Sequence, residues 1–305
     1  MNPFDLTIPT KITKKINEWC LILNDKFGID HIMNITLYGS QNYNIDTDTS
    51  DYDFKAIYVP SVEDALLKNP VSIELVNSKG EHCEVKDIRL MCDMYKKQNI
   101  NFLETLFTGY CRDNPIYRNS IDYLYTYRNR IARYNELKCL KSIAGQSLHT
   151  IKELENILEK TNAISEEELH KVRKKCANIL FLRFFIDKYI DRDYSFDECI
   201  WVYSDDVFHY TPHCMGKIDK NPNYTSYSYS FNFDIKAIIN QFKEDIFDIK
   251  DVRLFFNENI ERYFKEDFQY IMDIKPENTW FTIDEEIPKI LDYLCVNTIL
   301  RKELK

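Results

Sequence analysis

The chain has 305 residues, 44% of them hydrophobic and 29% charged, and its formal net charge is −9. This composition is typical of a soluble globular protein that is long enough for one large or two ordinary domains, and we expect two. It argues against a membrane-spanning protein, since no apolar run reaches the necessary length. It also argues against a zinc ribbon or redox pair, since the nine cysteines never occur as Cys-x-x-Cys. An acidic chain is a poor match for general, salt-driven nucleic-acid binding, so any RNA partner would need a local basic patch. Met1–Thr10 lacks a basic start that leads into an apolar signal core, so we expect a cytoplasmic protein.

The first predicted elements are a helix and two strands. Residues Lys11 to Phe27 place apolar side chains at helical spacing, and Gly28 follows as a stop signal. The apolar run Ile32 to Leu37 predicts a strand that ends at Gly39-Ser40. After a polar loop, Asp51 to Val59 predicts the second strand.

Two acids, Asp51 and Asp53, stand at the start of this second strand with one residue between them. Side chains alternate across a strand, so both carboxylates are expected on the same face and close together. Like charges at such a separation repel, and a divalent cation would neutralise both. With the Gly-Ser turn before it, the pair indicates a nucleotide-handling site.

These residues also carry a resemblance to a known family. The segments Leu37-Tyr38-Gly39-Ser40-Gln41 and Ser50-Asp51-Tyr52-Asp53-Phe54-Lys55 resemble the nucleotidyltransferases of the DNA polymerase beta superfamily. Within that superfamily they are similar to the predicted nucleotidyltransferases typified by RNA-ligase-associated bacterial and phage proteins. The likeness covers roughly Asn34 to Phe107. It implies an α+β fold, with a mixed-sheet nucleotidyltransferase domain over residues 1–114 and a mainly α-helical acceptor or substrate domain over residues 115–305.

The resemblance implies a chemistry and a set of site residues. A nucleoside monophosphate would pass from an NTP to an acceptor hydroxyl, for instance an RNA end, and pyrophosphate would leave. Asp51 and Asp53 would hold Mg²⁺ or Mn²⁺, and two-metal phosphoryl transfer calls for a further carboxylate near the attacking hydroxyl. Nucleotide binding is expected from the Gly-Ser turn and from one lysine of the helical half: Gly39, Ser40, Gln41 and Lys174.

The third carboxylate is expected on a later strand. After Pro60 the pattern predicts a helix over Val62 to Lys68, a strand over Val71 to Val76 and a strand over Glu81 to Ile88. Glu84 and Asp87 lie three apart on this last strand, so only one can face the aspartate pair. We favour Glu84 as catalytic residue and metal ligand, with Asp87 as the cap of the next helix. Further on, Glu104 is either a structural cap or an acid behind the metal ligands, and a structural role is favoured.

From Asn114-Pro115 onward the pattern is almost wholly helical. Two segments combine basic residues with helical periodicity: Arg118, Arg128, Arg130 and Arg133 in the first, and Lys171, Arg173, Lys174 and Lys175 in the second. Each is either an acceptor-binding surface or an ordinary solvated helix face.

Two alternatives to this enzyme remain open at this stage. One is a catalytically silent, nucleotidyltransferase-like binding or regulatory module, because a protein can lose its catalytic activity and keep its fold. The other is an enzyme that nucleotidylates a protein or a small molecule. Phosphate-binding P-loop and dinucleotide-binding glycine motifs are absent from the sequence. The sequence does not specify the base, the acceptor or the oligomeric state.

Overall fold

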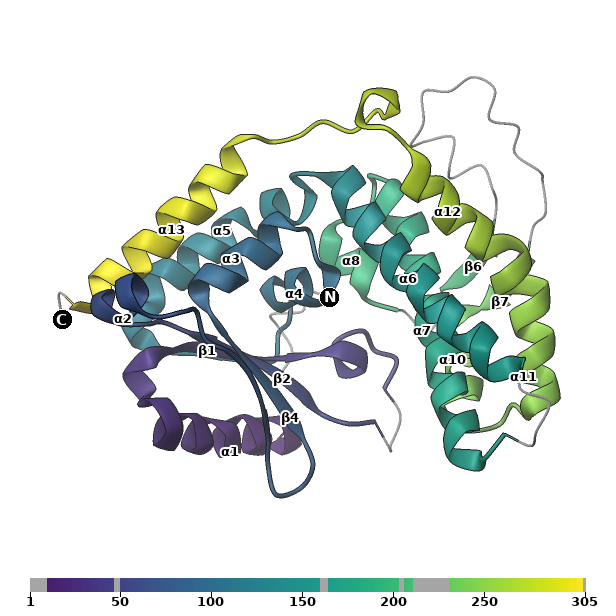
Figure 1. The fold of residues 1–305 in the computed structure, drawn as a ribbon, viewed down its shortest axis with the longest axis horizontal. Helices are drawn as coiled ribbons and strands as arrows, with labels where there is room; N and C mark the ends of the chain where they lie inside the picture. Colours follow the sequence, from purple (N-terminus) through teal and green to yellow (C-terminus); the bar gives the residue numbers. More distant parts are fainter. Residues whose placement is uncertain (1–9, 47–49, 160–163, 203–205, 211–230, 304–305) are drawn as a thin grey trace. The chain divides into compact units, whose positions relative to one another are not determined.

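A computed structural model describes residues 10–46, 50–159, 164–202, 206–210 and 231–303 of the chain. The protein is α+β and divides into two compact units (Figure 1). Unit 1 consists of Met1–Asn42, Thr49–Asn135 and Ile283–Lys305, and unit 2 consists of Tyr43–Asp48 and Glu136–Thr282.

These units do not follow the predicted boundary near residue 114. The helix α5 (Arg118–Arg133) packs on α3 (Ile88–Lys96), and the last helix, α13 (Glu286–Glu303), packs on both of them. Helices from both sides of the predicted boundary therefore share one core, and the second segment of unit 1 continues through α5 to Asn135.

Unit 1 is built around a five-stranded mixed sheet with the order β3-β4-β2-β1-β5. The central pair β1/β2 and the outer pairs β1/β5 and β3/β4 are antiparallel, whereas β2 and β4 are parallel. The strands are β1 (Ile32–Tyr38), β2 (Asp53–Tyr58), β3 (Ser72–Val76), β4 (His82–Asp87) and β5 (Cys111–Asp113). The four strands predicted from the sequence correspond to β1, β2, β3 and β4.

One face of this sheet is covered by α1 (Thr10–Phe27), as predicted (Figure 1). Trp19 and Leu23 of this helix are fully buried against strand residues such as Leu37 and Phe54. Burial of each such side chain contributes about 2 kcal/mol. Gly28, with φ of 81°, ends the helix in a conformation that favours glycine.

The other face of the sheet lies under α3, α4 (Ile100–Leu103) and α5 (Figure 1). The predicted break between α3 and α4 is present, and Gln98 in it has φ of 55°. The short helices η4 (Glu104–Leu106) and η5 (Pro115–Tyr117) complete this layer, and α2 (Val62–Leu67) follows β2. Because side chains alternate along a strand, this second face carries Tyr38, Asp53, Lys55 and Glu84.

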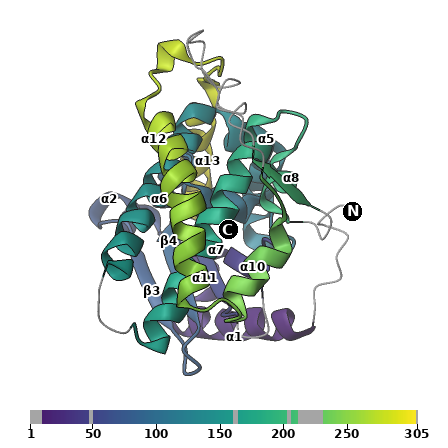
Figure 2. The same cartoon turned by 90° about the vertical axis from the view of Figure 1, so that its right-hand side faces the viewer.

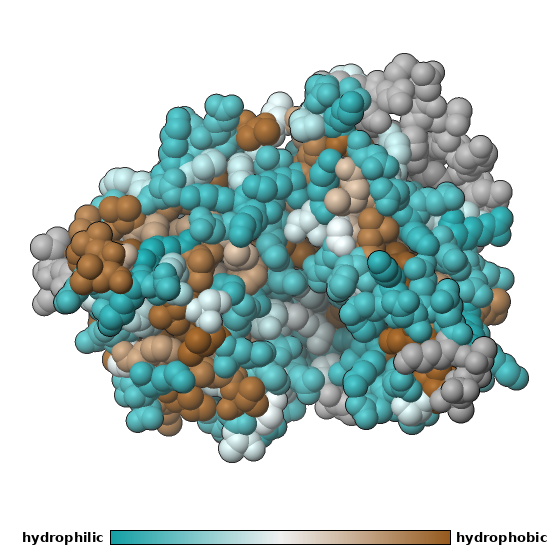
Figure 3. Space-filling model, viewed as in Figure 1, coloured by the Kyte–Doolittle hydropathy of each residue, from teal (hydrophilic) through white to brown (hydrophobic). Residues whose placement is uncertain are grey.

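Unit 1 also exposes apolar side chains at the far end of β2, where α2 and the end of α13 lie. Leu66 and Leu67 of α2 and Val296 and Leu300 of α13 are all exposed. Figure 3 shows hydrophobic residues gathered over these two helices. The polar start of β2 is at the opposite end of the strand.

Unit 2 is mainly helical, apart from a hairpin of β6 (Val207–Tyr210) and β7 (Phe231–Asp234). The central helix α7 (Glu166–Ile190) begins with the predicted capping box of Ser165 and Glu168, and α6 packs on it. A long helix passes through a π-helical stretch and runs without a break from α11 to α12 (Figure 2). The remaining elements are α6 (Glu136–Leu158), α8 (Phe196–Ile200), α10 (Ile235–Lys243), α11 (Ile249–Phe255), η6 (Phe256–Phe264), α12 (Lys265–Asp273) and η7 (Pro276–Asn278).

Among the residues that the structure describes, no helix is both long enough and apolar enough to span a bilayer.

Candidate functional site

The turn that follows β1 is the first part of the candidate site. Gly39 has φ of 81°, a conformation that a side chain would strain, and Gly39–Gln41 form a single 3₁₀ turn, η3. Asn42 N–H closes this turn by donating to the Gly39 carbonyl at 2.8 Å. Ser40 and Gln41 are both partly exposed. The predicted nucleotide-binding turn is therefore a tight, solvent-accessible loop.

Glu104 holds this turn in place from η4. Its carboxylate oxygen Oε2 accepts hydrogen bonds from the Gly39 N–H at 3.1 Å and from Asn42 Nδ2 at 3.2 Å. The side chain is fully buried. The favoured structural role of Glu104 agrees with these contacts, because it ties the backbone of the turn to the helical layer.

Asp53, the second acid of the pair, lies directly beside the turn. Asp53 is the first residue of β2 and pairs with Tyr38, the last residue of β1. A Cβ atom added at Gly39 would lie 3.9 Å from Asp53 Oδ2. Asp51 precedes the strand and is exposed.

Burial, reinforced by the negative charge of Asp51, raises the pKa of Asp53, and His82 and Lys55 oppose this shift. The two carboxylates therefore interact electrostatically, although Asp51 lies just before β2 and not, as predicted, within the same strand as Asp53. Neutralisation of their charge by a cation would relieve this repulsion.

Glu84 and Asp87 lie on opposite faces of β4, as the three-residue spacing predicted. Glu84 pairs with Lys55 in the parallel β2/β4 register, so it shares a face with Asp53. Asp87 is fully buried on the other face and caps α3, accepting from the Arg89 N–H at 2.9 Å. It also forms an ion pair with the Arg89 side chain at 2.7 Å. The predicted capping role of Asp87 is confirmed.

Glu84 is engaged by two lysines. Its Oε2 lies 3.0 Å from Lys55 Nζ, and its Oε1 lies 2.7 Å from Lys86 Nζ. Burial by itself would raise the pKa of Glu84, but the two lysines together hold that pKa below its usual value. The carboxylate is therefore ionised and paired.

Lys55 is the residue of the site that the sequence analysis did not single out. It is only 4% exposed, and its ammonium group lies 3.2 Å from the centre of the Tyr38 ring and 4.8 Å from that of Phe102. Burial lowers the pKa of Lys55, and the negative charges of Glu84, Glu104 and Asp53 oppose that change. The available signal was its position two residues after Asp53 in a strand, which places both on one face.

The donor set fits a divalent cation at the aspartate pair only. Carboxylate oxygens are the ligands that Mg²⁺ and Mn²⁺ prefer, and Asp51 and Asp53 supply them beside the turn. Over the described ranges, no three His, Cys, Asp or Glu side chains are grouped so as to hold a metal ion. Glu84, expected as a third ligand, is instead in contact with Lys55 and Lys86.

Lys174 and its basic neighbours in the sequence belong to unit 2. Lys174 is an exposed residue of α7 in unit 2, with its own electrostatic interactions there. Its neighbours in the sequence form ion pairs within unit 2: Lys171 with Glu167, Arg173 with Glu166 and Asp245, and Lys175 with Glu153.

In unit 1, Arg118 pairs with Asp122, and Arg130 pairs with Asp284 and Glu286. Arg128 stacks over Phe107. These contacts favour the interpretation of both basic segments as ordinary, ion-paired helix faces.

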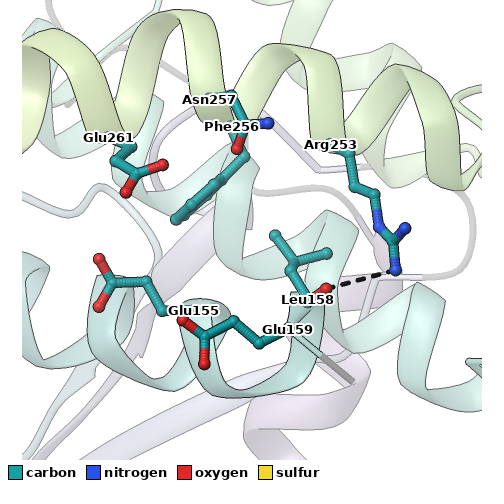
Figure 4. Close-up of a pocket in the computed structure, with 7 residues that line it drawn as sticks. All are labelled: Glu155, Leu158, Glu159, Arg253, Phe256, Asn257 and Glu261. Carbon is teal, nitrogen blue, oxygen red and sulfur yellow. Dashed lines mark hydrogen bonds between the residues drawn. The ribbon is translucent and has the colours of Figure 1, made fainter. Parts of the chain in front are cut away.

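Unit 2 contains an open pocket between the end of α6 and the α11–η6 helix (Figure 4). Its walls carry acids from both helices, and Phe256 projects between them. Arg253 Nη2 donates to the Leu158 carbonyl at 3.3 Å, and Glu155 forms an ion pair with Lys265 at 2.5 Å. The pocket is lined mainly by acids, and its one lining cation, Arg253, is hydrogen-bonded to Leu158, so we do not assign a chemical role to it.

No protein-family model matches this chain, and no curated protein is significantly similar to it.

Proposed function

We propose that unit 1 is the catalytic part of a metal-dependent nucleotidyltransferase of the DNA polymerase beta type. The observation that carries this proposal is the position of the aspartate pair. Asp53 begins β2 directly beside the Gly39 turn at the end of the antiparallel neighbour β1, and Asp51 lies two residues before it in the chain. A phosphate bound at such a turn lies next to two carboxylates that can share a cation with it.

Each part of this arrangement has a definite task in the proposed reaction. Gly39 has no side chain, so no Cβ atom stands between the turn and the Asp53 carboxylate where a phosphate group would approach the backbone. The partly exposed Ser40 hydroxyl donates to a phosphate oxygen, and Gln41 borders the same space. Glu104 keeps the turn in its binding conformation through the Gly39 N–H.

Asp51 and Asp53 would hold Mg²⁺ or Mn²⁺. When bound, the ion would neutralise phosphate charge and lower the pKa of the acceptor hydroxyl. The products are a nucleotidylated acceptor and pyrophosphate. An RNA end, a protein and a small molecule are all candidate acceptors, and Lys174 stays a predicted contact of the triphosphate.

A transfer assay with α-labelled NTPs tests the proposal. The purified protein is incubated with Mg²⁺ and each of the four NTPs, with RNA, tRNA, protein or no added acceptor. We expect label transfer and pyrophosphate release that Asp53→Asn abolishes. Asp87→Asn is the matched control, because it removes an acid from the opposite face of the same sheet. Equal transfer by the wild type and by Asp53→Asn would contradict the assignment.

One observation favours a second candidate, a catalytically silent NTP-binding module. Glu84 is paired with two lysines, which leaves two carboxylates rather than three at the proposed metal site. Nucleotide binding that depends on Asp53, without pyrophosphate release from any acceptor, would identify this module.

A further inference from the structure

We infer that Glu84 is the fixed counter-ion of Lys55 and Lys86, and that the site takes one divalent cation, at Asp51 and Asp53. This inference rests on the proposed function and deepens it. A two-metal site would need the third carboxylate as a ligand, whereas the contacts of Glu84 assign it to two lysines.

The first argument is the geometry at Glu84. One lysine approaches each carboxylate oxygen, Lys55 at 3.0 Å and Lys86 at 2.7 Å. Each oxygen keeps a second lone pair, but a cation bound there would lie next to two ammonium groups and be repelled by both. Ligation by Glu84 would therefore require that both lysines move away.

The second argument is that Lys55 has little freedom to move. It is 4% exposed, and it lies between the rings of Tyr38 and Phe102. A buried ammonium group that loses its carboxylate partner is strongly destabilising, because it has lost the solvation of water as well. The fold therefore holds Glu84 to Lys55.

Lys86 adds a second restraint. It pairs with Glu84 and also donates from Nζ to Ser72 Oγ at 3.1 Å, across to β3. Glu84 is thus held by Lys86 from its own strand and by Lys55 from β2. Lys86 in turn contacts Ser72 of β3, and Lys55 contacts Tyr38 of β1.

The third argument is charge balance. Glu84 is paired with the lysines, Glu104 is hydrogen-bonded to the turn and Glu74 is in contact with His82, so Asp51 and Asp53 are the acids that we assign to the cation. One divalent ion matches their two charges. The positive charge of Lys55, two residues from Asp53 on the same face, disfavours a second ion at the Glu84 side.

Titration of the folded protein with Mn²⁺, followed by the electron paramagnetic resonance of free Mn²⁺, tests the inference without an activity readout. We expect one ion per chain, with at least a tenfold weaker affinity in Asp53→Asn. In Glu84→Gln we expect the same stoichiometry and an affinity within about threefold of the wild type, together with a lower melting temperature.

Lys86→Met keeps the test informative if Glu84→Gln does not fold. Removal of this lysine frees one oxygen of Glu84 while Lys55 keeps its partner, and we expect the stoichiometry to stay at one. Two ions in the wild type, a tenfold loss of Mn²⁺ affinity in Glu84→Gln, or a second ion in Lys86→Met would each overturn the inference while leaving the proposed function intact. Mn²⁺ binding that ignores Asp53→Asn would overturn the proposed function itself.

Discussion

Replacement of Glu104 offers a direct test of how the Gly39 turn is held. Glu104→Ala removes the buried acceptor of two hydrogen bonds, one from Gly39 N–H and one from Asn42 Nδ2. Each buried donor left without an acceptor costs roughly 1–3 kcal/mol, and the cavity adds about 1 kcal/mol. We therefore expect the free energy of unfolding of unit 1 to fall by about 3–7 kcal/mol.

Two milder variants separate the contributions to this loss. Glu104→Gln keeps an oxygen that can accept from Gly39 N–H and should cost only about 1–2 kcal/mol, since a charged acceptor is replaced by a neutral one. Asn42→Ala removes one of the two donors and should cost a similar amount. In both, the turn keeps the Gly39 contact.

Amide hydrogen exchange at Gly39 reports on the turn itself, independently of unit 2. A local loss of about 3 kcal/mol in Glu104→Ala should speed this exchange about 10²-fold, whereas Glu104→Gln should speed it far less. NTP affinity should fall in the same order. If the alanine and glutamine variants exchange equally fast, the hydrogen bonds to Glu104 do not hold the turn and the reasoning is refuted.

Three further predictions concern single ionisable residues. Asp53→Asn should lower nucleotidyl transfer at least ~10²-fold in the labelled-NTP assay, because it removes a metal ligand. The fold should stay intact, because the substitution relieves charge repulsion in the metal-free protein. A fully active variant would exclude Asp53 from the chemistry. Asp87→Asn keeps an oxygen that can cap α3 but breaks the buried ion pair with Arg89. Urea unfolding should therefore show a free energy of unfolding that is lower by about 1–3 kcal/mol, while nucleotidyl transfer is unchanged. Loss of transfer in a folded Asp87→Asn variant would contradict this prediction. Lys243 donates to the Ile45 carbonyl at 2.5 Å, and burial lowers its pKa from 10.5 to about 8. Between pH 8 and 10.5 the unfolded chain therefore holds a proton that the folded chain has released, so the wild type should gain up to ~3 kcal/mol of stability over this window relative to Lys243→Met. Parallel stability curves for the two proteins would refute the assignment to Lys243.

Short-range patterns in the sequence were sufficient to predict the helices and strands around the site. The apolar spacing of α1, the strands on either side of Gly39-Ser40 and the cap at Asp87 all follow from propensities within a few residues. Likewise, the alternation of side chains along β4 separated Glu84 from Asp87 without knowledge of the neighbouring strand.

Contacts between distant segments decided the rest. Glu84 was assignable to a face but not to a partner, because the parallel pairing that brings Lys55 opposite it joins two strands separated by α2 and β3. Lys55 could be interpreted as an ordinary strand residue until Phe102 and Tyr38 were seen to enclose it.

The division of the chain into units is also a tertiary result. Residues 43–48 follow the Gly39 turn directly, yet Tyr43 stacks on Phe181 of unit 2, and its carbonyl accepts a hydrogen bond from the Val202 N–H of that unit. At the other end of the chain, α13 packs with α3 and α5 of unit 1. The sequence by itself determined which elements form, because these depend on local spacing. Which charges meet and which segments share a core depend on long-range packing, and only the tertiary structure shows them.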